Sequence, residues 1–329
     1  MMKFFEQVLE AFAVGDAMGM PTEFMEQNEI KKNFGFVDRL LDTKLSRIHK
    51  NLKKGQITDD TEQNIFLIKS FYENGRVDID STIRGLQCWI DETHPDEKGY
   101  IGPSTLRAFE KINKGKDINE VGINGTTCGA AMRSLAPALC TKKGQITSLK
   151  EAILCCSIPT HNTNIALEAA MALGFGYHHA AIESSFDEII ESMVLGAEIG
   201  RNSGKGKFIG ASTGSRIEFA VTQVQKMQTP YEVLNFIYDV IGTTMEANEV
   251  VPAAVAIFAY TMENTWLSIK MGASVGGDTD TIAAIAGALS CLYAGSHSLP
   301  RKILNEVKEV NKIELEKYAH MASVMFGDG

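Results

Sequence analysis

The sequence of 329 residues predicts an all-α protein, with one compact domain over residues 1–329 in which many helices cross at near-orthogonal and other varied angles. Three observations support this fold class. Apolar residues recur at helical spacing along most of the chain, and no strand-like alternation persists over several segments. The linkers are short and rich in Gly, Asn, Ser and Pro. With 8 prolines and no low-complexity segment, nothing in the chain marks a domain boundary.

The predicted helices of the first half of the chain each show apolar residues three and four positions apart. Gly75 is the expected C-cap of the second helix, and the segment 102–105, GPST, is typical of a helix start. These helices are expected at residues 4–19, 60–75, 78–92, 102–115 and 148–158.

The second half continues the same pattern, and its predicted helices are residues 163–180, 186–200, 231–242, 252–262, the uncharged run after Asp280, and 299–312. The Gly-rich segment 203–215 lies between two of them. No strand precedes this segment, so it is not a dinucleotide-binding or P-loop signature. A surface loop is favoured there, with phosphate binding by its backbone amides as the alternative.

Composition excludes several classes of protein. Hydrophobic residues make up 44 % of the chain and charged residues 22 %, which is typical of soluble globular proteins. The net charge of −9 argues against a general nucleic-acid or membrane-surface binder. Six cysteines without CxxC spacing indicate reduced core thiols, and Glu6 and Glu10 interrupt any apolar leader. We therefore expect a cytoplasmic protein without membrane or nucleic-acid partners.

Two acidic clusters occur at predicted helix starts. One is GGDTDT at 276–281, and the other is ITDDTE at 57–62. Taken singly, each is more typical of a helix cap, because Asp and Thr are favoured N-caps. However, a cap needs one acceptor, whereas each cluster supplies several, and neighbouring buried carboxylates repel one another. If the two helix starts face each other, they form an all-oxygen site for Mg²⁺, Mn²⁺ or Ca²⁺, with room for a pair of ions about 3.5–4 Å apart.

Further candidate residues lie between these clusters. Asp16 has small neighbours and fits a tight helix-packing joint, while Glu23 is either a solvated loop residue or a catalytic carboxylate. The segments 124–137, with Asn124, Gly125 and Arg133, and 157–170, with Thr160 and His161, are predicted walls of a pocket. A lone histidine such as His161 is more often a cap or a satisfied partner than a ligand.

These residues together resemble the ADP-ribosylglycohydrolase family, which includes dinitrogenase reductase-activating glycohydrolase and the ADP-ribosyl-acceptor hydrolases. The matching segments run in family order over nearly the whole chain. They are GDAMGMPTEF at 15–24, TDDT at 58–61, NG and AMRSLAP within 124–137, TH at 160–161, and GGDTDTIAAIAGAL at 276–289.

The resemblance implies an all-α fold with a binuclear Mg²⁺ centre, in which Mn²⁺ is an alternative ion. It implies hydrolysis at the anomeric carbon of an ADP-ribosyl or related ribosyl group, carried by an ADP-ribosylated protein or a small ribosylated molecule. Glu23 and Asp278 are the candidate catalytic carboxylates, and Asn124, Gly125 and His161 the candidate substrate-binding residues. The implied metal ligands are Thr58, Asp59, Asp60, Asp278, Asp280 and Thr281.

The segment 242–260 departs from the family pattern, because it lacks the aromatic and Gly-rich loop that many relatives carry before their last helices. That loop is expected to contact the distal part of the ligand. Two alternatives to an ADP-ribosyl substrate therefore stay open: a smaller ribosylated substrate such as a nucleoside-like N-glycoside, and a non-catalytic ribosyl-binding relative.

Overall fold

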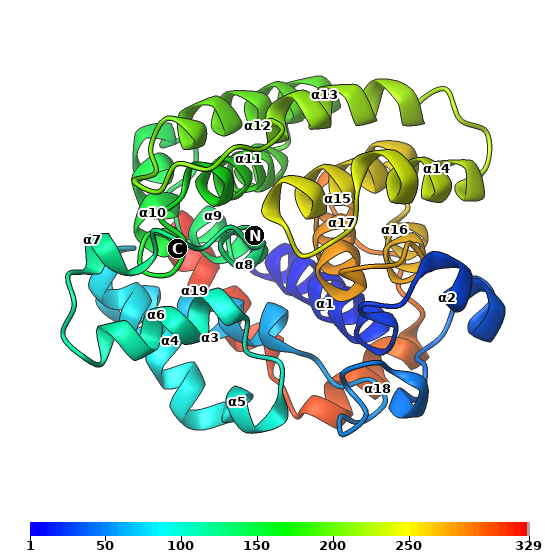
Figure 1. Cartoon of the computed structure of the whole chain (residues 1–329), viewed down its shortest axis with the longest axis horizontal. Coiled ribbons are helices and arrows are strands. Elements are labelled where there is room, and N and C mark those ends of the chain that lie inside the picture. The colour runs from blue at the N-terminus through cyan, green and yellow to red at the C-terminus, as the bar shows by residue number, and fades with distance from the viewer. Residues whose placement is uncertain (328–329) are drawn as a thin grey trace.

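A computed structural model describes residues 1–327. Within them the regular secondary structure is helical, and β-structure is limited to two isolated bridges, Thr127 with Glu246 and Thr163 with Gly206. The expected all-α fold is confirmed. Figure 1 shows helices that cross in several directions around one centre.

The described helices differ greatly in length. Their bounds are α1 (Met2–Gly19), α2 (Gln27–Phe34), α3 (Asp59–Asn74), α4 (Ile79–Thr93), α5 (Pro95–Lys98), α6 (Pro103–Ile112), α7 (Ile118–Val121), α8 (Gly129–Met132), α9 (Leu135–Leu139), α10 (Ile146–Ser157), α11 (Asn164–Ala181), α12 (Phe186–Arg201), α13 (Thr213–Val224), α14 (Pro230–Phe236), α15 (Ala247–Thr261), α16 (Thr265–Ser274), α17 (Thr279–Ala294), α18 (Arg301–Asn311) and α19 (Leu315–Phe326). Short 3₁₀ turns cover Met20–Thr22 and Thr43–Leu45, and a π-helical turn covers Ile237–Ile241.

The core is built on helices that are apolar on all sides. In α11, α15 and α17 nearly every residue is buried, and α1 is buried from Val8 to Gly19. The contact of α1 with α17 is close, because a Cβ on Gly19 would lie 2.3 Å from the Thr279 carbonyl oxygen. The small residues of the GDAMG segment therefore set the position of the acidic start of α17 relative to the end of α1. None of the described helices is both long and apolar enough to cross a bilayer.

The structure differs from the sequence prediction at α15. The predicted start was Pro252, but the helix begins five residues earlier and includes this proline. Proline has no amide hydrogen, so the carbonyl of Asn248 lacks its helical donor. Arg216 Nη1 supplies the missing donor to that carbonyl at 2.7 Å. A side chain from α13 thus makes the proline tolerable inside the helix.

Candidate metal centre and active-site cavity

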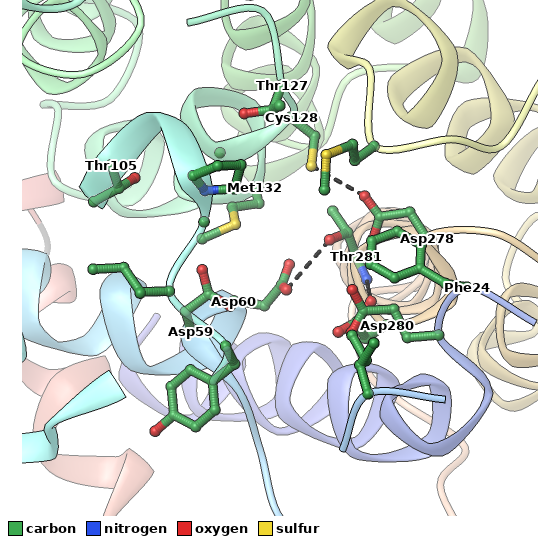
Figure 2. A pocket seen from close by; sticks show the side chains of 18 of the residues that line it. Phe24, Asp59, Asp60, Thr105, Thr127, Cys128, Met132, Asp278, Asp280 and Thr281 are labelled. Atoms are coloured by element: carbon green, nitrogen blue, oxygen red, sulfur yellow. Dashed lines mark hydrogen bonds between the residues drawn. The ribbon is translucent and has the colours of Figure 1, made fainter. Parts of the chain in front are cut away.

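One cavity brings distant segments of the chain together. It has a volume of about 170 Å³. Its wall is formed by the residues that follow α1, the starts of α3, α6 and α17, and the segment around α8 (Figure 2). The lining residues are Glu23, Phe24, Ile48, His49, Asp59, Asp60, Gly99, Tyr100, Ile101, Gly102, Pro103, Thr105, Thr127, Cys128, Gly129, Met132, His161, Met245, Asp278, Asp280 and Thr281.

The two predicted acidic clusters meet in this cavity. Asp59 and Asp60 begin α3, Asp278 is the N-cap of α17, and Asp280 lies in its first turn. The hydroxyl of Thr281 donates a hydrogen bond to Asp60 Oδ2 at 3.3 Å, although 221 residues separate the two along the chain. The expectation that the two helix starts face each other is confirmed by this contact.

Helix capping does not account for these carboxylates. Neither Thr58, the N-cap of α3, nor Asp278, the N-cap of α17, makes a side-chain capping bond. Asp16 of α1 caps α3 instead: its carboxylate accepts from the amides of Thr58, at 3.0 and 3.1 Å, and Thr61, at 3.2 Å. It also accepts from the hydroxyls of Thr58 at 2.9 Å and Thr61 at 2.6 Å. This tertiary cap engages the hydroxyls of Thr58 and Thr61 and leaves the carboxylates of Asp59 and Asp60 available for another role.

The negative charge of the buried carboxylates favours the binding of cations. Burial, and then repulsion from Asp280, raises the pKa of Asp59 and Asp60 well above the usual range. Burial and the charge of Asp278 raise the pKa of Asp280 to about 7. Burial and Asp280 raise the pKa of Asp16 to about 7 as well. Carboxylates crowded in this way either hold protons or bind positive charge.

A buried carboxylate oxygen identifies where such a charge would sit. Asp60 Oδ1 is buried and has no hydrogen-bond partner among the described residues. An orphaned anionic oxygen in a protein interior is costly unless a ligand satisfies it. The hydroxyl and carboxylate oxygens that line this cavity suit hard divalent cations. The donor set therefore fits Mg²⁺ or Mn²⁺.

Glu23 extends the acidic wall and has a partner that sequence reasoning missed. His49 Nε2 hydrogen-bonds Glu23 Oε2, and one ligand atom each from Glu23, His49 and Asp280 lie within 4.8 Å of one another. Burial lowers the pKa of His49, which favours the neutral ring. Burial, followed by the charges of Asp280 and Asp278, raises the pKa of Glu23 well above its usual range. The only sequence signal for His49 was its place in a loop shortly before TDDT.

The backbone holds Glu23 against Asp278. Phe24 N donates to the Gly277 carbonyl at 2.7 Å, and Gly277 N donates to the Met25 carbonyl at 3.0 Å. Gly277 has a φ of 82°, and a Cβ there would lie 1.9 Å from the Thr243 carbonyl oxygen. Only glycine fits this turn. The glycines before DTDT thus tie the Glu23 segment directly to the start of α17.

His161 lines the cavity on the side of α6 and α8. Its ring is buried, Nδ1 lies 2.7 Å from Thr160 Oγ1, and Nε2 lies 3.0 Å from Thr127 Oγ1. Burial, with the nearby charges of Arg133 and Arg107, holds the pKa of His161 well below its usual range, so the ring is neutral. Both ring nitrogens are satisfied by hydroxyls, and a role in substrate binding stays a prediction.

Two other predicted binding residues lie outside the lining of the cavity. Asn124 is exposed, and Gly125 is buried behind the wall, where a Cβ would lie 2.5 Å from the Thr160 carbonyl oxygen. Gly125 therefore allows close packing against the Thr160–His161 backbone. Neither Asn124 nor Gly125 lines the cavity, whose wall includes Thr127 and Cys128 from the same loop.

Cys128 and Met245 were not predicted as site residues. Cys128 Sγ donates to Asp278 Oδ2 at 3.1 Å, and burial beside Asp278 raises the pKa of this thiol, which keeps its proton. Met245 belongs to the divergent segment 242–260 and forms part of the cavity wall. Cys128 had only small neighbours in the sequence, and Met245 is apolar itself, so neither gave a chemical signal.

The chain is similar to a known protein family and to several individual proteins. The family model described as ADP-ribosylglycohydrolase matches residues 5–327. An uncharacterized protein of Escherichia coli K12, YegU, is 29 % identical over 322 residues, which are 95 % of each chain. An uncharacterized protein of Archaeoglobus fulgidus is 26 % identical over 313 residues, covering 94 % of this chain and 93 % of that one.

Two further similarities concern proteins with descriptive names. The ADP-ribosyl-[dinitrogen reductase] glycohydrolase of Rhodospirillum rubrum is 31 % identical over 177 residues, which are 53 % of this chain and 58 % of that protein. A solved structure named ADP-ribosylglycohydrolase-related protein complex superposes with a TM-score of 0.68 at 22 % identity, over 99 % of this chain and 98 % of the other. The superposition supports the all-α fold.

Proposed function

Because this chain belongs to the ADP-ribosylglycohydrolase family, we propose that it is a divalent-metal-dependent glycohydrolase that cleaves the anomeric bond of an ADP-ribosyl conjugate. One observation carries the metal-dependent part of this proposal. Carboxylates from both halves of the chain line one cavity with Asp60, whose Oδ1 is a buried oxygen without a partner among the described residues. ADP-ribosylated arginine on a protein is the conjugate we test first.

The proposed cofactor is a pair of Mg²⁺ ions, with Mn²⁺ as the alternative. The residues that would hold them are Thr58, Asp59, Asp60, Asp278, Asp280 and Thr281. When bound, such ions orient the sugar and favour the loss of a proton from water. Their charge also offsets the mutual repulsion that raises the pKa values of the carboxylates.

Glu23 is the proposed general base. Its carboxylate lies in the cavity wall, and one of its oxygens is oriented by His49. Asp278, the other candidate, already accepts from Cys128 and sits within the acidic cluster. Cleavage of the glycosidic bond develops positive charge on the sugar ring, which the surrounding carboxylates stabilise. Glu23 would take the proton from the attacking water and is therefore expected to affect kcat most.

A hydrolysis assay tests the proposal. ADP-ribosyl-arginine, ADP-ribosyl-serine and free nucleosides are incubated with the protein in Mg²⁺ and in chelator. We expect turnover of an ADP-ribosyl conjugate that chelator abolishes, and a loss of at least about a hundredfold in kcat for Glu23→Gln. Turnover of nucleosides alone would replace the proposed substrate, and turnover that is indifferent to chelator would contradict the metal requirement.

A further inference from the structure

We infer that Arg133 is a positioning residue that acts on two walls of the active-site cavity. One hydrogen-bonded arm, the Gln63 arm, runs from Arg133 through Gln63 to the carboxylate of Asp59 and sets its orientation. The other, the Thr160 arm, runs through Thr160 to His161 and determines which ring nitrogen carries the proton. This inference rests on the proposed function for the identity of Asp59 as a metal ligand.

Arg133 is a buried cation whose hydrogen-bond partners are uncharged. Its side chain is fully buried. Nε and Nη2 donate to the Cys156 carbonyl at 3.2 and 3.1 Å, Nη2 also donates to Thr160 Oγ1, and Nη1 donates to Gln63 Oε1 at 3.4 Å. A charge in a protein interior is costly without such partners. Gln63 and Thr160 each continue to a residue of the cavity wall, so the buried charge acts on the site through them.

The Gln63 arm has one possible direction when Asp59 is ionised. A guanidinium only donates hydrogen bonds, and an ionised carboxylate only accepts them. Gln63 therefore turns its amide oxygen to Arg133, and its amide nitrogen donates to Asp59 Oδ2 at 3.2 Å. The two residues lie on one side of α3, since they are four positions apart. Arg133 thus excludes the flipped amide, whose oxygen would face the carboxylate.

The Thr160 arm also has one direction. Thr160 Oγ1 accepts from Arg133, and its own hydrogen goes to His161 Nδ1 at 2.7 Å. A proton on Nδ1 would leave the hydroxyl hydrogen of the buried Thr160 without an acceptor among the described residues. The neutral His161 ring therefore carries its proton on Nε2 and donates to Thr127 Oγ1 at 3.0 Å. Both of these wall residues thus have a fixed donor direction.

The residue that follows Gln63 in α3 holds Arg133 between the two arms. Arg133 lies in the joint between α8 and α9. Asn64 Nδ2 donates to the Met132 carbonyl at 2.9 Å, and Asn64 Oδ1 accepts from the amide of Ala136 at 3.0 Å. The backbone on each side of Arg133 is thus bound to the helix that carries the acidic cluster. The guanidinium therefore reaches both arms from a fixed position.

Two readouts that need no turnover separate the arms. Calorimetric titration with Mn²⁺ reports on the Gln63 arm. The ring ¹⁵N chemical shifts of His161, measured by NMR in Mg²⁺ and assigned with His161→Gln, report on the Thr160 arm. Gln63→Met should weaken Mn²⁺ binding by about tenfold, because the hydrogen bond that orients a ligating carboxylate is lost, and should leave the His161 shifts unchanged.

Thr160→Val should do the reverse: it should move the Nδ1 shift of His161, which loses its donor, and leave the Mn²⁺ affinity unchanged. Arg133→Met should change both readouts. Arg133→Lys, which keeps a cationic donor, should restore part of the Mn²⁺ affinity. If Arg133→Met does not fold, Gln63→Met and Thr160→Val still decide the question, because each changes one arm.

The matched control is Thr141→Val, which removes a buried hydroxyl outside the network and should change neither readout; this hydroxyl donates to the Pro137 carbonyl at 2.8 Å. A proton on Nδ1 of His161 in the unsubstituted protein would overturn the inference, and so would full Mn²⁺ affinity in Gln63→Met. Equal changes of both readouts in both single-arm variants would reduce the network to packing and overturn it as well. The proposed function is judged separately: absence of Mn²⁺ binding by the unsubstituted protein would contradict the metal centre, whereas the NMR shifts would still decide on the Thr160 arm.

Discussion

Removal of divalent cations should make the stability of this protein fall as the pH rises. In the metal-free folded state, burial and neighbouring charge raise the pKa of Asp280 from its ordinary 3.8 to about 7. Between these two values the folded state binds more protons than the unfolded state. The free energy of unfolding therefore decreases with increasing pH over that window. Asp16 has the same shift and acts in the same direction.

The size of the effect follows from the shift. A carboxylate whose pKa rises from 3.8 to about 7 loses about 4 kcal/mol of folded-state stability once it is ionised. Bound Mg²⁺ favours the ionised form, so this loss does not occur in the metal-bound protein. The ion also stabilises the folded state by mass action, by about 2.7 kcal/mol at a concentration one hundred times its Kd. The difference in stability between Mg²⁺ and chelator should therefore grow by several kcal/mol from pH 5 to pH 8.

Thermal unfolding at pH 5, 6, 7 and 8, with Mg²⁺ and with chelator, measures this difference. Buried histidines such as His161 have lowered pKa values and make both curves rise with pH. Because His161 does not belong to the acidic cluster, its contribution cancels in the difference between the two conditions. A gap in Tm that is the same at pH 5 and pH 8 would refute the reasoning, and so would the absence of any gap.

Three further predictions concern single residues. Asp60→Asn should reduce turnover at least about a hundredfold and shrink the Mg²⁺-dependent rise in Tm, with unchanged helical circular dichroism; full Mg²⁺ stabilisation would remove Asp60 from the ligand set. Gly277→Ala should lower the free energy of unfolding, measured in urea, by about 2–3 kcal/mol or more, because its φ of 82° and the Thr243 carbonyl exclude a side chain. A decrease below about 1 kcal/mol would contradict this. His49→Ala should lower kcat about tenfold with little change in KM, since Glu23 loses the hydrogen-bond partner that orients it. His49→Gln should restore part of the rate.

Local patterns predicted the long helices well. The apolar repeat and Gly75 marked α3, and Gly75 is indeed the C-cap, with a φ of 73°. The helices α13, α16 and α19 were not predicted, because their apolar sides become meaningful only against α15, α17 and α1. Short helices of this kind draw their stability from tertiary packing rather than from propensity.

The sequence could predict those site residues that cluster along the chain. It could not predict the residues that only the fold brings into the site. Two clusters of carboxylates at helix starts are visible in the chain, and so is their excess over what capping needs. His49 was invisible, since it lies in an irregular loop and acts through Glu23, which is 26 residues away.

The role of Asp16 explains why the acidic clusters stay free in the folded protein. A helix that begins with Thr-Asp-Asp would ordinarily use one of these side chains to cap its own amides. Asp16 does so from α1, at the cost of placing a further carboxylate near Asp280. A carboxylate is needed for this cap, since both of its oxygens accept from Thr58 and Thr61, and an Asn at position 16 would turn its amide donors toward those groups. The charge of Asp16 adds to the repulsion around Asp280, which bound cations would offset, so Asp16 is consistent with the proposed metal centre although it touches no proposed ligand except Thr58.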